Sequence, residues 1–446
     1  MRAHTVVVGA GIAGLACATE LVARGRDDVL VLEAAPRAGG PAETVACQGY
    51  TIERGPNTVR GSDALARLAE AAGTTLVPAR RARPAVVSGG TVTELPPPLR
   101  KVVSGSFLPY RGMASLLAEP LRPVRAGPRS VRAFVEERFG ATVADRFADL
   151  LTLGIYGTTA DQVGFESAFP ELAAALDGAG GRVAALALRR LVSRSSAAGA
   201  ATRRGVVSTP LGLGGLCGAL AARLGGRLRL ATPVLRARGQ DGAFELELGG
   251  SAPATLSCQQ LVLAIPGPAA ARVLDDRDAG PLLGAYRSVP QLVASFALED
   301  PRCAERWQGL GFLVPPRERL PLLGCLLPSN LFPGRAPSGA LLLSVFAAPV
   351  LHAAPDAELG PALARVLKHL LGADRPPALL DVARYPEGIP LYDVEHRART
   401  RELRARLEAA RGPLVCGAAY DGVAFAAAAE SGLAAARHLI EASVGS

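Results

Sequence analysis

The feature that most constrains the fold is a glycine-rich turn near the N-terminus. Residues 5–8 (TVVV) form an apolar, β-branched run typical of a buried strand, and Gly9, Gly11 and Gly14 follow in the spacing G-x-G-x-x-G. A helical stretch ending at Gly25 and a second apolar run come next. Because strand, turn, helix and strand follow in this order, the segment predicts a βαβ unit that binds a dinucleotide.

Each residue type in this unit has a physical task. Gly9 permits a tight turn, Gly11 lets the backbone approach a pyrophosphate at the positive end of the helix, and Gly14 allows close packing of helix on strand. Glu33 follows the second strand, 19 residues after Gly14. Its carboxylate can accept hydrogen bonds from a ribose 2′-hydroxyl, which disfavours a 2′-phosphate.

The charge and composition of the chain limit the classes of partner that it can bind. The 446 residues carry a net charge of +9, and Lys101 and Lys368 are the only lysines. A positive chain favours anionic partners, such as a polycarboxylate substrate, a phosphate cofactor or an acidic membrane surface. The arginines are scattered, aromatic residues make up only 4%, and no nucleic-acid-binding motif is present, so we expect no nucleic-acid partner.

The cysteines and the apolar segments indicate the compartment. Seven dispersed cysteines, with no C-x-x-C and no Cys/His cluster, predict reduced thiols, no disulfide framework and no metal site. No signal-peptide pattern and no apolar run of membrane-spanning length is present. We expect a cytoplasmic protein, either free or peripheral on the inner face of the cell membrane, and a monomer or homodimer.

The chain after Glu33 resembles a known flavin signature. Residues 33–40 (EAAPRAGG) and 50–58 (YTIERGPNT) are similar to the extended FAD motif of the superfamily of amine oxidases, phytoene desaturases and protoporphyrinogen oxidases. The resemblance implies that Arg37 lies against the adenosine, that the turn at Gly40 follows the pyrophosphate, and that residues 55–58 approach the isoalloxazine. Pro41 departs from the family, where arginine is common.

Two later segments resemble the same superfamily. Residues 207–216 match its glycine pair before a helix, and we expect 227–234 to form a strand that brings Val234 to the adenine. A strand at 414–417, a glycine turn and an Ala-rich helix resemble the segment that faces the flavin pyrimidine ring, with Ala424 where glycine is common. The expected cofactor is FAD, bound non-covalently. Its expected contacts are Gly9, Ala10, Gly11, Ile12, Ala13, Gly14, Glu33, Ala34, Arg37, Gly40, Gly55, Pro56, Asn57, Thr58, Val234, Gly417, Gly422, Val423, Ala424 and Phe425.

The positions of these segments predict the domains. The expected fold class is α/β, with a discontinuous Rossmann-like FAD-binding domain of the amine-oxidase type, a mixed-sheet substrate domain and an inserted helical domain. We expect the FAD-binding domain at 1–82, 205–270 and 385–446. The helical, membrane-facing domain is expected at 97–204, and the substrate-binding domain at 83–96 and 271–384.

Motifs in the middle of the chain resemble the protoporphyrinogen/coproporphyrinogen oxidase family. They occur in order at 130–140 (SVRAFVEERFG), 154–159 (GIYGTT), 167–172 (SAFPEL), 311–315 (GFLVP), 331–337 (LFPGRAP) and 388–396 (GIPLYDVEH). The sequence departs from the family at Gly157-Thr158-Thr159, Leu391 and Glu395. The resemblance implies oxidation of a porphyrinogen to a porphyrin in heme biosynthesis, in three two-electron steps, with O₂ as acceptor and H₂O₂ as product.

The same resemblance implies the substrate contacts. Arg83 is expected to bind a propionate, with Arg80, Arg81 or Arg60 as alternatives. Gly154, Leu313 and Phe332 are expected to face the macrocycle, which needs apolar walls and at least one cation. No residue is expected to act as a separate catalytic group, because the flavin carries the redox chemistry. His396 is expected to be structural.

Alternative functions stay open at this point. An amine oxidase usually needs an aromatic cage beside the flavin, and the chain has only one Trp and seven Tyr. A desaturase acts on an uncharged polyene and would not need the cation at Arg83. The departures at Gly157-Thr158-Thr159 and Leu391 leave room for a non-catalytic FAD-binding relative. The choice between protoporphyrinogen IX, with two propionates, and coproporphyrinogen III, with four, is also open.

Overall fold

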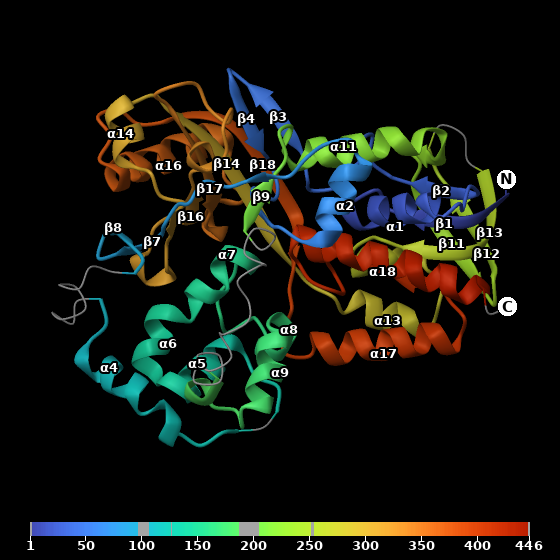
Figure 1. Ribbon diagram of the computed structural model, residues 1–446, viewed down its shortest axis with the longest axis horizontal. Coiled ribbons are helices and arrows are strands. Elements are labelled where there is room, and N and C mark those ends of the chain that lie inside the picture. Colours follow the sequence, from blue (N-terminus) through green and yellow to red (C-terminus); the bar gives the residue numbers. More distant parts are fainter. Residues whose placement is uncertain (1, 97–106, 126, 187–204, 251–253, 445–446) are drawn as a thin grey trace.

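The computed structural model describes residues 2–96, 107–125, 127–186, 205–250 and 254–444. The chain forms three units: a sheet covered on both faces by helices, a second large sheet, and a group of short helices (Figure 1). The expected α/β fold class is confirmed by this architecture.

The first sheet is built from three separated parts of the sequence. Its order is β10-β2-β1-β13-β12-β11, and β19 pairs with β13. Strands β10, β2, β1, β13 and β19 are parallel, whereas β11, β12 and β13 form an antiparallel meander. The strands span Arg2–Val8 (β1), Val29–Leu32 (β2), Leu228–Arg229 (β10), Val234–Gln240 (β11), Ala243–Leu248 (β12), Ala254–Leu263 (β13) and Leu414–Val415 (β19).

Two layers of helices enclose this sheet (Figure 1). One face is covered by α1 (Ile12–Ala23), α2 (Asp63–Ala71), α11 (Gly212–Leu224) and α18 (Phe425–Val444). The other face is covered by α12 (Gly267–Val273), α13 (Ala279–Gly284) and α17 (His396–Ala409). A sheet buried on both faces explains why β1 and β2 are continuous apolar runs.

Two local expectations need correction. Residues 227–234 do not form one strand: β10 ends at Arg229 at one edge of the sheet, Thr232 donates its N–H to Glu33 O (2.8 Å), and β11 begins at Val234 at the opposite edge. Residues 271–286 belong to the expected substrate domain, but Leu283 and Tyr286 pack in the core of the first sheet. This packing favours a domain boundary near residue 287.

The second sheet has the order β18-β14-β17-β16-β15-β7-β8. Helices α14 (Pro301–Arg306) and α16 (Asp356–Leu371) pack on it, and Leu359, Leu363 and Leu367 are fully buried there. Strand β18 is long and leads back to the first unit (Figure 1). The strands span Pro84–Ser88 (β7), Thr91–Glu94 (β8), Ser288–Leu298 (β14), Gly311–Leu313 (β15), Leu322–Leu326 (β16), Leu341–Ala347 (β17) and Ala378–Pro390 (β18), and helix α15 spans Pro328–Leu331.

The third unit consists of short helices within residues 107–186. Its core contains the stacked rings of Phe134 and Phe165, whose centroids are 3.8 Å apart, and a buried ion pair between Arg138 and Glu119. The helices span Tyr110–Leu117 (α4), Val131–Phe139 (α5), Ala141–Phe147 (α6), Leu153–Tyr156 (α7), Phe165–Ala168 (α8) and Pro170–Gly178 (α9), with a 3₁₀ turn (η1) at Glu119–Leu121.

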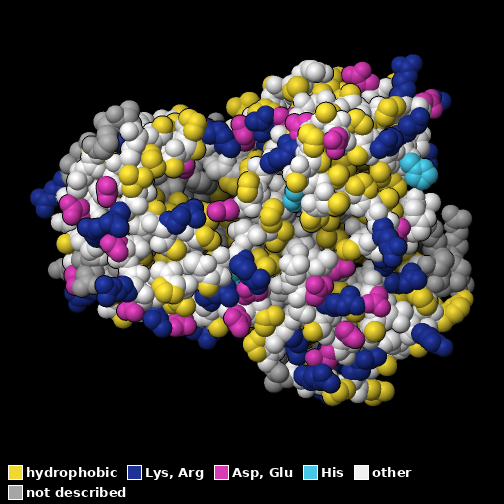
Figure 2. Space-filling view, turned by 180° about the vertical axis from the view of Figure 1, so that it is seen from behind, with side chains coloured by type: hydrophobic (Ala, Val, Ile, Leu, Met, Phe, Trp, Pro, Cys, Tyr) yellow, Lys and Arg dark blue, Asp and Glu magenta, His cyan; other side chains and the backbone are white. Residues whose placement is uncertain are grey.

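Two small sheets complete the chain. The hairpin is formed by β3 (Thr44–Cys47) and β4 (Tyr50–Glu53), and β9 (Val206–Ser208) lies between β5 (Val59–Arg60) and β6 (Val77–Pro78). Among the described residues, no helix has both the length and the apolarity needed to cross a membrane. Basic and acidic side chains are interspersed over the face shown in Figure 2.

Candidate functional site

The N-terminus of α1 is free to bind an anion. Gly11 is its N-cap residue, no side chain caps the helix, and no acidic residue lies in its first turn. Gly11 forms an isolated parallel bridge with Gly39, and the backbone N–H of Ala13 donates to no other residue within the described part of the chain. Uncapped N–H groups and the positive end of the helix dipole favour a phosphate at this position.

The glycines of the first turn are required by close packing. A Cβ atom on Gly14 would lie 1.9 Å from Gly9 O, and Gly9 itself has a φ of +102°. Any larger residue at position 14 would push α1 away from the end of β1. The turn therefore holds the helix N-terminus against the edge of the sheet, as the sequence predicts.

Glu33 is held in a fixed orientation at the end of β2. Its two carboxylate oxygens accept the N–H groups of Ala10 (2.7 Å) and Ala35 (2.9 Å). The neighbouring segment leads from Thr232 to the buried Val234 at the start of β11. The carboxylate is half-buried and keeps lone pairs that can accept a ribose hydroxyl.

The loop expected along the pyrophosphate packs directly on the first turn. Gly39 and Gly40 both have positive φ, and Gly39 donates its N–H to Ala10 O (2.8 Å). The guanidinium of Arg37 forms an ion pair with Glu43 (3.2 Å). This pairing fixes Arg37 at the rim of the site.

The segment 55–58 carries an unsatisfied polar atom. Asn57 is buried, and its side-chain nitrogen donates to Gly55 O (3.1 Å), but its Oδ1 has no hydrogen-bond partner within the described chain. Gly55 cannot be larger, because its Cβ would lie 2.0 Å from Pro41 O. A buried acceptor without a partner is costly unless a ligand supplies a donor.

A second helix N-terminus lies beside the first. A Cβ on Gly432 of α18 would lie 2.0 Å from Ala13 O, and a Cβ on Gly417 would lie 3.3 Å from the Ala13 side chain. The backbone N–H groups of Val423, Ala424 and Phe425 donate to no residue in the described ranges. The starts of α1 and α18 therefore present free donors in the same region, although they are more than 400 residues apart.

A buried ion pair lies next to the segment 55–58. Arg335 donates to Glu53 (3.1 Å) and to Ser208 (2.9 Å), and both charged side chains are at most 3% exposed. Burial raises the pKa of Glu53 above its ordinary value of 4.5, and the Arg335 charge opposes this shift. The pair joins the end of β4, which leads into residues 55–58, to the segment that follows α15. Sequence analysis did not single out this pair.

The structure brings two predicted substrate residues close together. A Cβ on Gly154 of α7 would lie 3.7 Å from the Leu313 side chain of β15. Gly154 is exposed and Leu313 is half-buried, as expected for residues that line an open surface between the helical unit and the second sheet. Ile155, next to Gly154, is 47% exposed and adds apolar surface there.

Arg83 and Phe332 lie in different environments. Arg83 precedes β7, which pairs with β15, and its side chain is 73% exposed and only 3.7 Å from Glu94. Phe332 is buried, and the Arg335 guanidinium lies 5.8 Å from its ring centroid. The alternatives Arg60, Arg80 and Arg81 are all exposed. Arg83 is therefore accessible to an anion, whereas Phe332 is buried beside Arg335 and does not present its ring on an open surface.

Gln291 of β14 is a site residue that sequence analysis missed. Its side chain is buried, its Nε2 has no partner in the described chain, and a Cβ on Gly157 would lie 2.3 Å from that nitrogen. A Cβ on Gly388 would lie 2.8 Å from Gln291 Cγ. Tyr385 lies opposite Gln291 on β18, and its hydroxyl reaches Pro41 O (3.4 Å). The Gln291 amide therefore faces the C-terminal end of α7, and its neighbour Tyr385 reaches the loop that contains Pro41.

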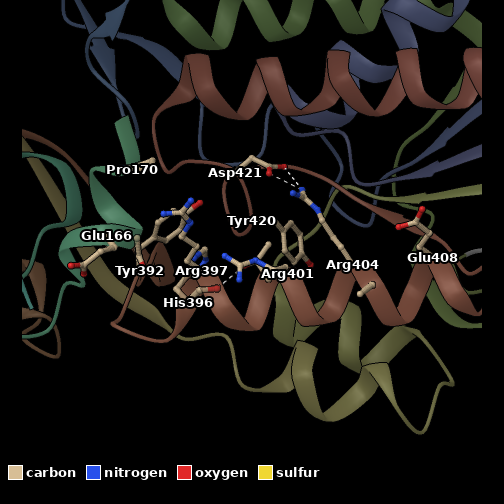
Figure 3. A pocket seen from close by; sticks show the side chains of 13 residues that line it. Glu166, Pro170, Tyr392, His396, Arg397, Arg401, Arg404, Glu408, Tyr420 and Asp421 are labelled. Atoms are coloured by element: carbon tan, nitrogen blue, oxygen red, sulfur yellow. Dashed lines mark hydrogen bonds and ion pairs between the residues drawn. The ribbon is translucent and has the colours of Figure 1, made fainter. Parts of the chain in front are cut away.

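A cavity of about 530 Å³ lies along α17, between α8 and the turn that carries Tyr420 and Asp421 (Figure 3). Arg397, Arg401 and Arg404 follow one another along one side of it. None of the predicted substrate residues lines this cavity. We therefore do not place the substrate there.

The seven cysteines are all free, and six are buried. Burial raises the pKa of Cys17 and Cys217 to about 12, so these thiols stay protonated and inert. No cluster of His, Cys, Asp and Glu in the described residues could hold a metal ion.

The fold and the paired helix N-termini define a class of protein, the flavin-binding proteins with a discontinuous dinucleotide fold. The family model for flavin containing amine oxidoreductases matches residues 12–440, and the chain belongs to this family. A flavin is therefore the cofactor for which the free donors and the unpaired Asn57 oxygen are suited.

Known proteins similar to this chain agree with this assignment. A coproporphyrinogen III oxidase of Propionibacterium freudenreichii subsp. freudenreichii is 29% identical over 478 residues, covering 94% of this chain and 87% of the relative. A chloroplastic protoporphyrinogen oxidase of Nicotiana tabacum is 27% identical over 425 residues, covering 88% and 76%. A crystal structure from Exiguobacterium sp. 255-15, provisionally named a protoporphyrinogen oxidase, has a TM-score of 0.81 at 24% identity over 98% of both chains. The family resemblance predicted from the motifs is confirmed.

Proposed function

We propose that this chain is an FAD-dependent oxidase that converts a porphyrinogen to a porphyrin in heme biosynthesis. The observation that carries the proposal is the close approach of Gly154 to Leu313, where a Cβ on the glycine would lie 3.7 Å from the leucine side chain. The relatives that act on coproporphyrinogen III or protoporphyrinogen support the substrate class.

The donors of the site suit a non-covalent FAD. The N-terminus of α1 would hold the pyrophosphate, Glu33 the adenosine ribose, and Val423, Ala424 and Phe425 the pyrimidine end of the flavin. Bound FAD would take three electron pairs from the substrate and pass them to O₂, giving three H₂O₂. Arg37, Asn57 and Thr58 would contact the cofactor between its adenosine end and its pyrimidine end.

The substrate side of the site would bind and orient the macrocycle. Leu313 and Gly154 provide an apolar surface on which a flat tetrapyrrole can lie, and Arg83 would bind a propionate at the rim. Phe332 would act indirectly, by packing against Arg335, which is paired with Glu53. No protein side chain needs to exchange a covalent bond with the substrate.

We also infer a peripheral contact with a membrane surface through the helical unit. Leu117 of α4 is 84% exposed, Leu121 of η1 is 88% exposed, and Tyr110 of α4 is 65% exposed. The exposed Arg111 and Arg125 lie nearby in sequence and suit anionic lipid. Arg129 and Arg132 of the same unit are paired with acidic side chains and contribute less.

Aerobic turnover tests the function. The purified protein, supplied with FAD, should convert protoporphyrinogen IX or coproporphyrinogen III to the fluorescent porphyrin and release three H₂O₂ per porphyrin. The substrate with the higher kcat/KM identifies the branch of the pathway. Normal FAD binding with no porphyrin from either substrate, above the non-enzymatic rate, would refute the proposal and direct the search to amines and polyenes.

A further inference from the structure

One tyrosine bridges the turn from Gly417 to Gly422, which leads into α18. The Tyr392 hydroxyl donates to Ala418 O (2.9 Å) and accepts the N–H of Gly422 (2.5 Å). Tyr392 follows β18 and comes just before α17. Burial raises the pKa of its phenol, so the hydroxyl stays neutral and can both donate and accept.

His396 holds the next peptide of the same turn. Its Nε2 lies 2.8 Å from Ala419 O, and its ring stacks on Tyr392 with centroids 3.7 Å apart and planes 18° apart. Burial lowers the pKa of His396, so the neutral ring donates from Nε2 to the carbonyl. Figure 3 shows both rings at the start of α17, close to Tyr420 of the turn.

The two ends of the turn are fixed by charge and by α18 itself. Ser431 accepts the N–H of Gly417 (2.8 Å) and donates to Asp421 (2.5 Å), and Arg404 of α17 bonds both oxygens of Asp421 (2.7 Å each). The dashed lines between Arg404 and Asp421 are visible in Figure 3. Beyond Gly422, the N–H groups that face the candidate flavin site have no such partners.

We propose that Tyr392 and His396 are positioning residues, which hold the 417–422 turn so that the free N–H groups of Val423, Ala424 and Phe425 point at the flavin. The inference rests on the proposed flavin site. It assigns the last motif of the sequence, 388–396, to the cofactor side of the site. The side chains act through the backbone of the turn and do not touch the substrate.

Tyr392→Phe tests the proposal, because it removes the hydroxyl and keeps the ring that stacks on His396. We expect the Kd for FAD, measured by fluorescence titration of the apoprotein, to rise about tenfold, since one buried bridging hydroxyl is lost. We also expect a more negative reduction potential of the bound flavin, because fewer aligned N–H donors would stabilise its more negatively charged reduced form less. His396→Phe should act in the same direction.

The matched control is Tyr286→Phe. The Tyr286 hydroxyl bonds Thr400 (2.8 Å) and no backbone group of the turn, and the substitution keeps the ring that packs edge-on against Tyr420, with centroids 5.2 Å apart. It should lower the thermal midpoint as Tyr392→Phe does, while FAD affinity and potential stay at the wild-type values. Equal FAD affinity and potential in wild type and Tyr392→Phe would overturn the positioning role. Failure of the wild-type protein to bind any flavin would instead overturn the proposed function.

Discussion

At the scale of single residues, Arg83 is the clearest test of substrate recognition. Its guanidinium is exposed and only loosely paired with Glu94, so it is free to bind a carboxylate. We predict that Arg83→Ala raises KM for the porphyrinogen about tenfold, the loss of one charge-assisted hydrogen bond, with kcat within a factor of about three. Steady-state kinetics by porphyrin fluorescence measures both parameters.

The control for this prediction is Glu94→Gln, which removes the competing carboxylate and should leave KM unchanged or lower it. A KM for Arg83→Ala equal to that of the wild type would remove Arg83 from the site. Arg80 and Arg81 would then be the next residues to test.

The unpaired amide of Gln291 leads to a prediction about stability as well as substrate binding. An unpaired buried amide costs about 1–3 kcal/mol, so Gln291→Met, which keeps the shape, should raise the thermal midpoint. Ser344→Ala removes another unpaired buried group from the same sheet and serves as the control. A lower midpoint for Gln291→Met would show that the amide is satisfied. A raised midpoint together with a higher KM would identify it as a substrate contact.

At the scale of helices, the site depends on how closely α1 and α18 approach. Gly432→Ala would place a Cβ 2.0 Å from Ala13 O. We predict a loss of about 1–3 kcal/mol of unfolding free energy and weaker FAD binding, because the two N-termini would separate. Chemical denaturation and FAD titration measure the two effects.

A matched substitution is Gly218→Ala in α11, where a Cβ would meet no atom within 4 Å. It should raise the unfolding free energy by about 0.5–1 kcal/mol, through helix propensity alone. Unfolding free energy and FAD affinity that stay at wild-type values in Gly432→Ala would contradict the close packing of α1 and α18.

The sequence predicted those elements whose structure depends on local signals. The βαβ unit with Gly9, Gly11 and Gly14 could be predicted because strand, turn and helix follow one another in the chain. The pair of Glu53 and Arg335 could not, because its members are 282 residues apart. Gln291 was missed for the same reason: its environment is made by Gly157 and Gly388, which are distant in sequence.

The hydrophobic periodicity of the sequence also could not predict that β10 and β11 are separate strands. Residues 227–234 alternate like one strand, but β10 pairs with β2 whereas β11 pairs with β12 at the far edge of the sheet. Edge choice depends on tertiary pairing, which a single sequence does not encode locally.

At the scale of the whole molecule, the exposed apolar residues of the helical unit predict membrane association. Leu117→Ser with Leu121→Ser should reduce co-sedimentation with vesicles containing anionic lipid, without changing turnover of dispersed substrate. Leu211→Ser is the control, because Leu211 is 70% exposed but lies outside this unit. Binding unchanged in the double variant, or lost equally in the control, would contradict a specific surface.

The central claim is that the flavin held between α1 and α18 oxidises a porphyrinogen bound beside Leu313 and Gly154. The most direct test is anaerobic mixing of the FAD-loaded protein with protoporphyrinogen IX or coproporphyrinogen III. We predict that the yellow flavin band bleaches with at least one of them, recovers when air is admitted, and that porphyrin fluorescence appears. A flavin that dithionite reduces normally, but that neither porphyrinogen bleaches, would contradict the claim.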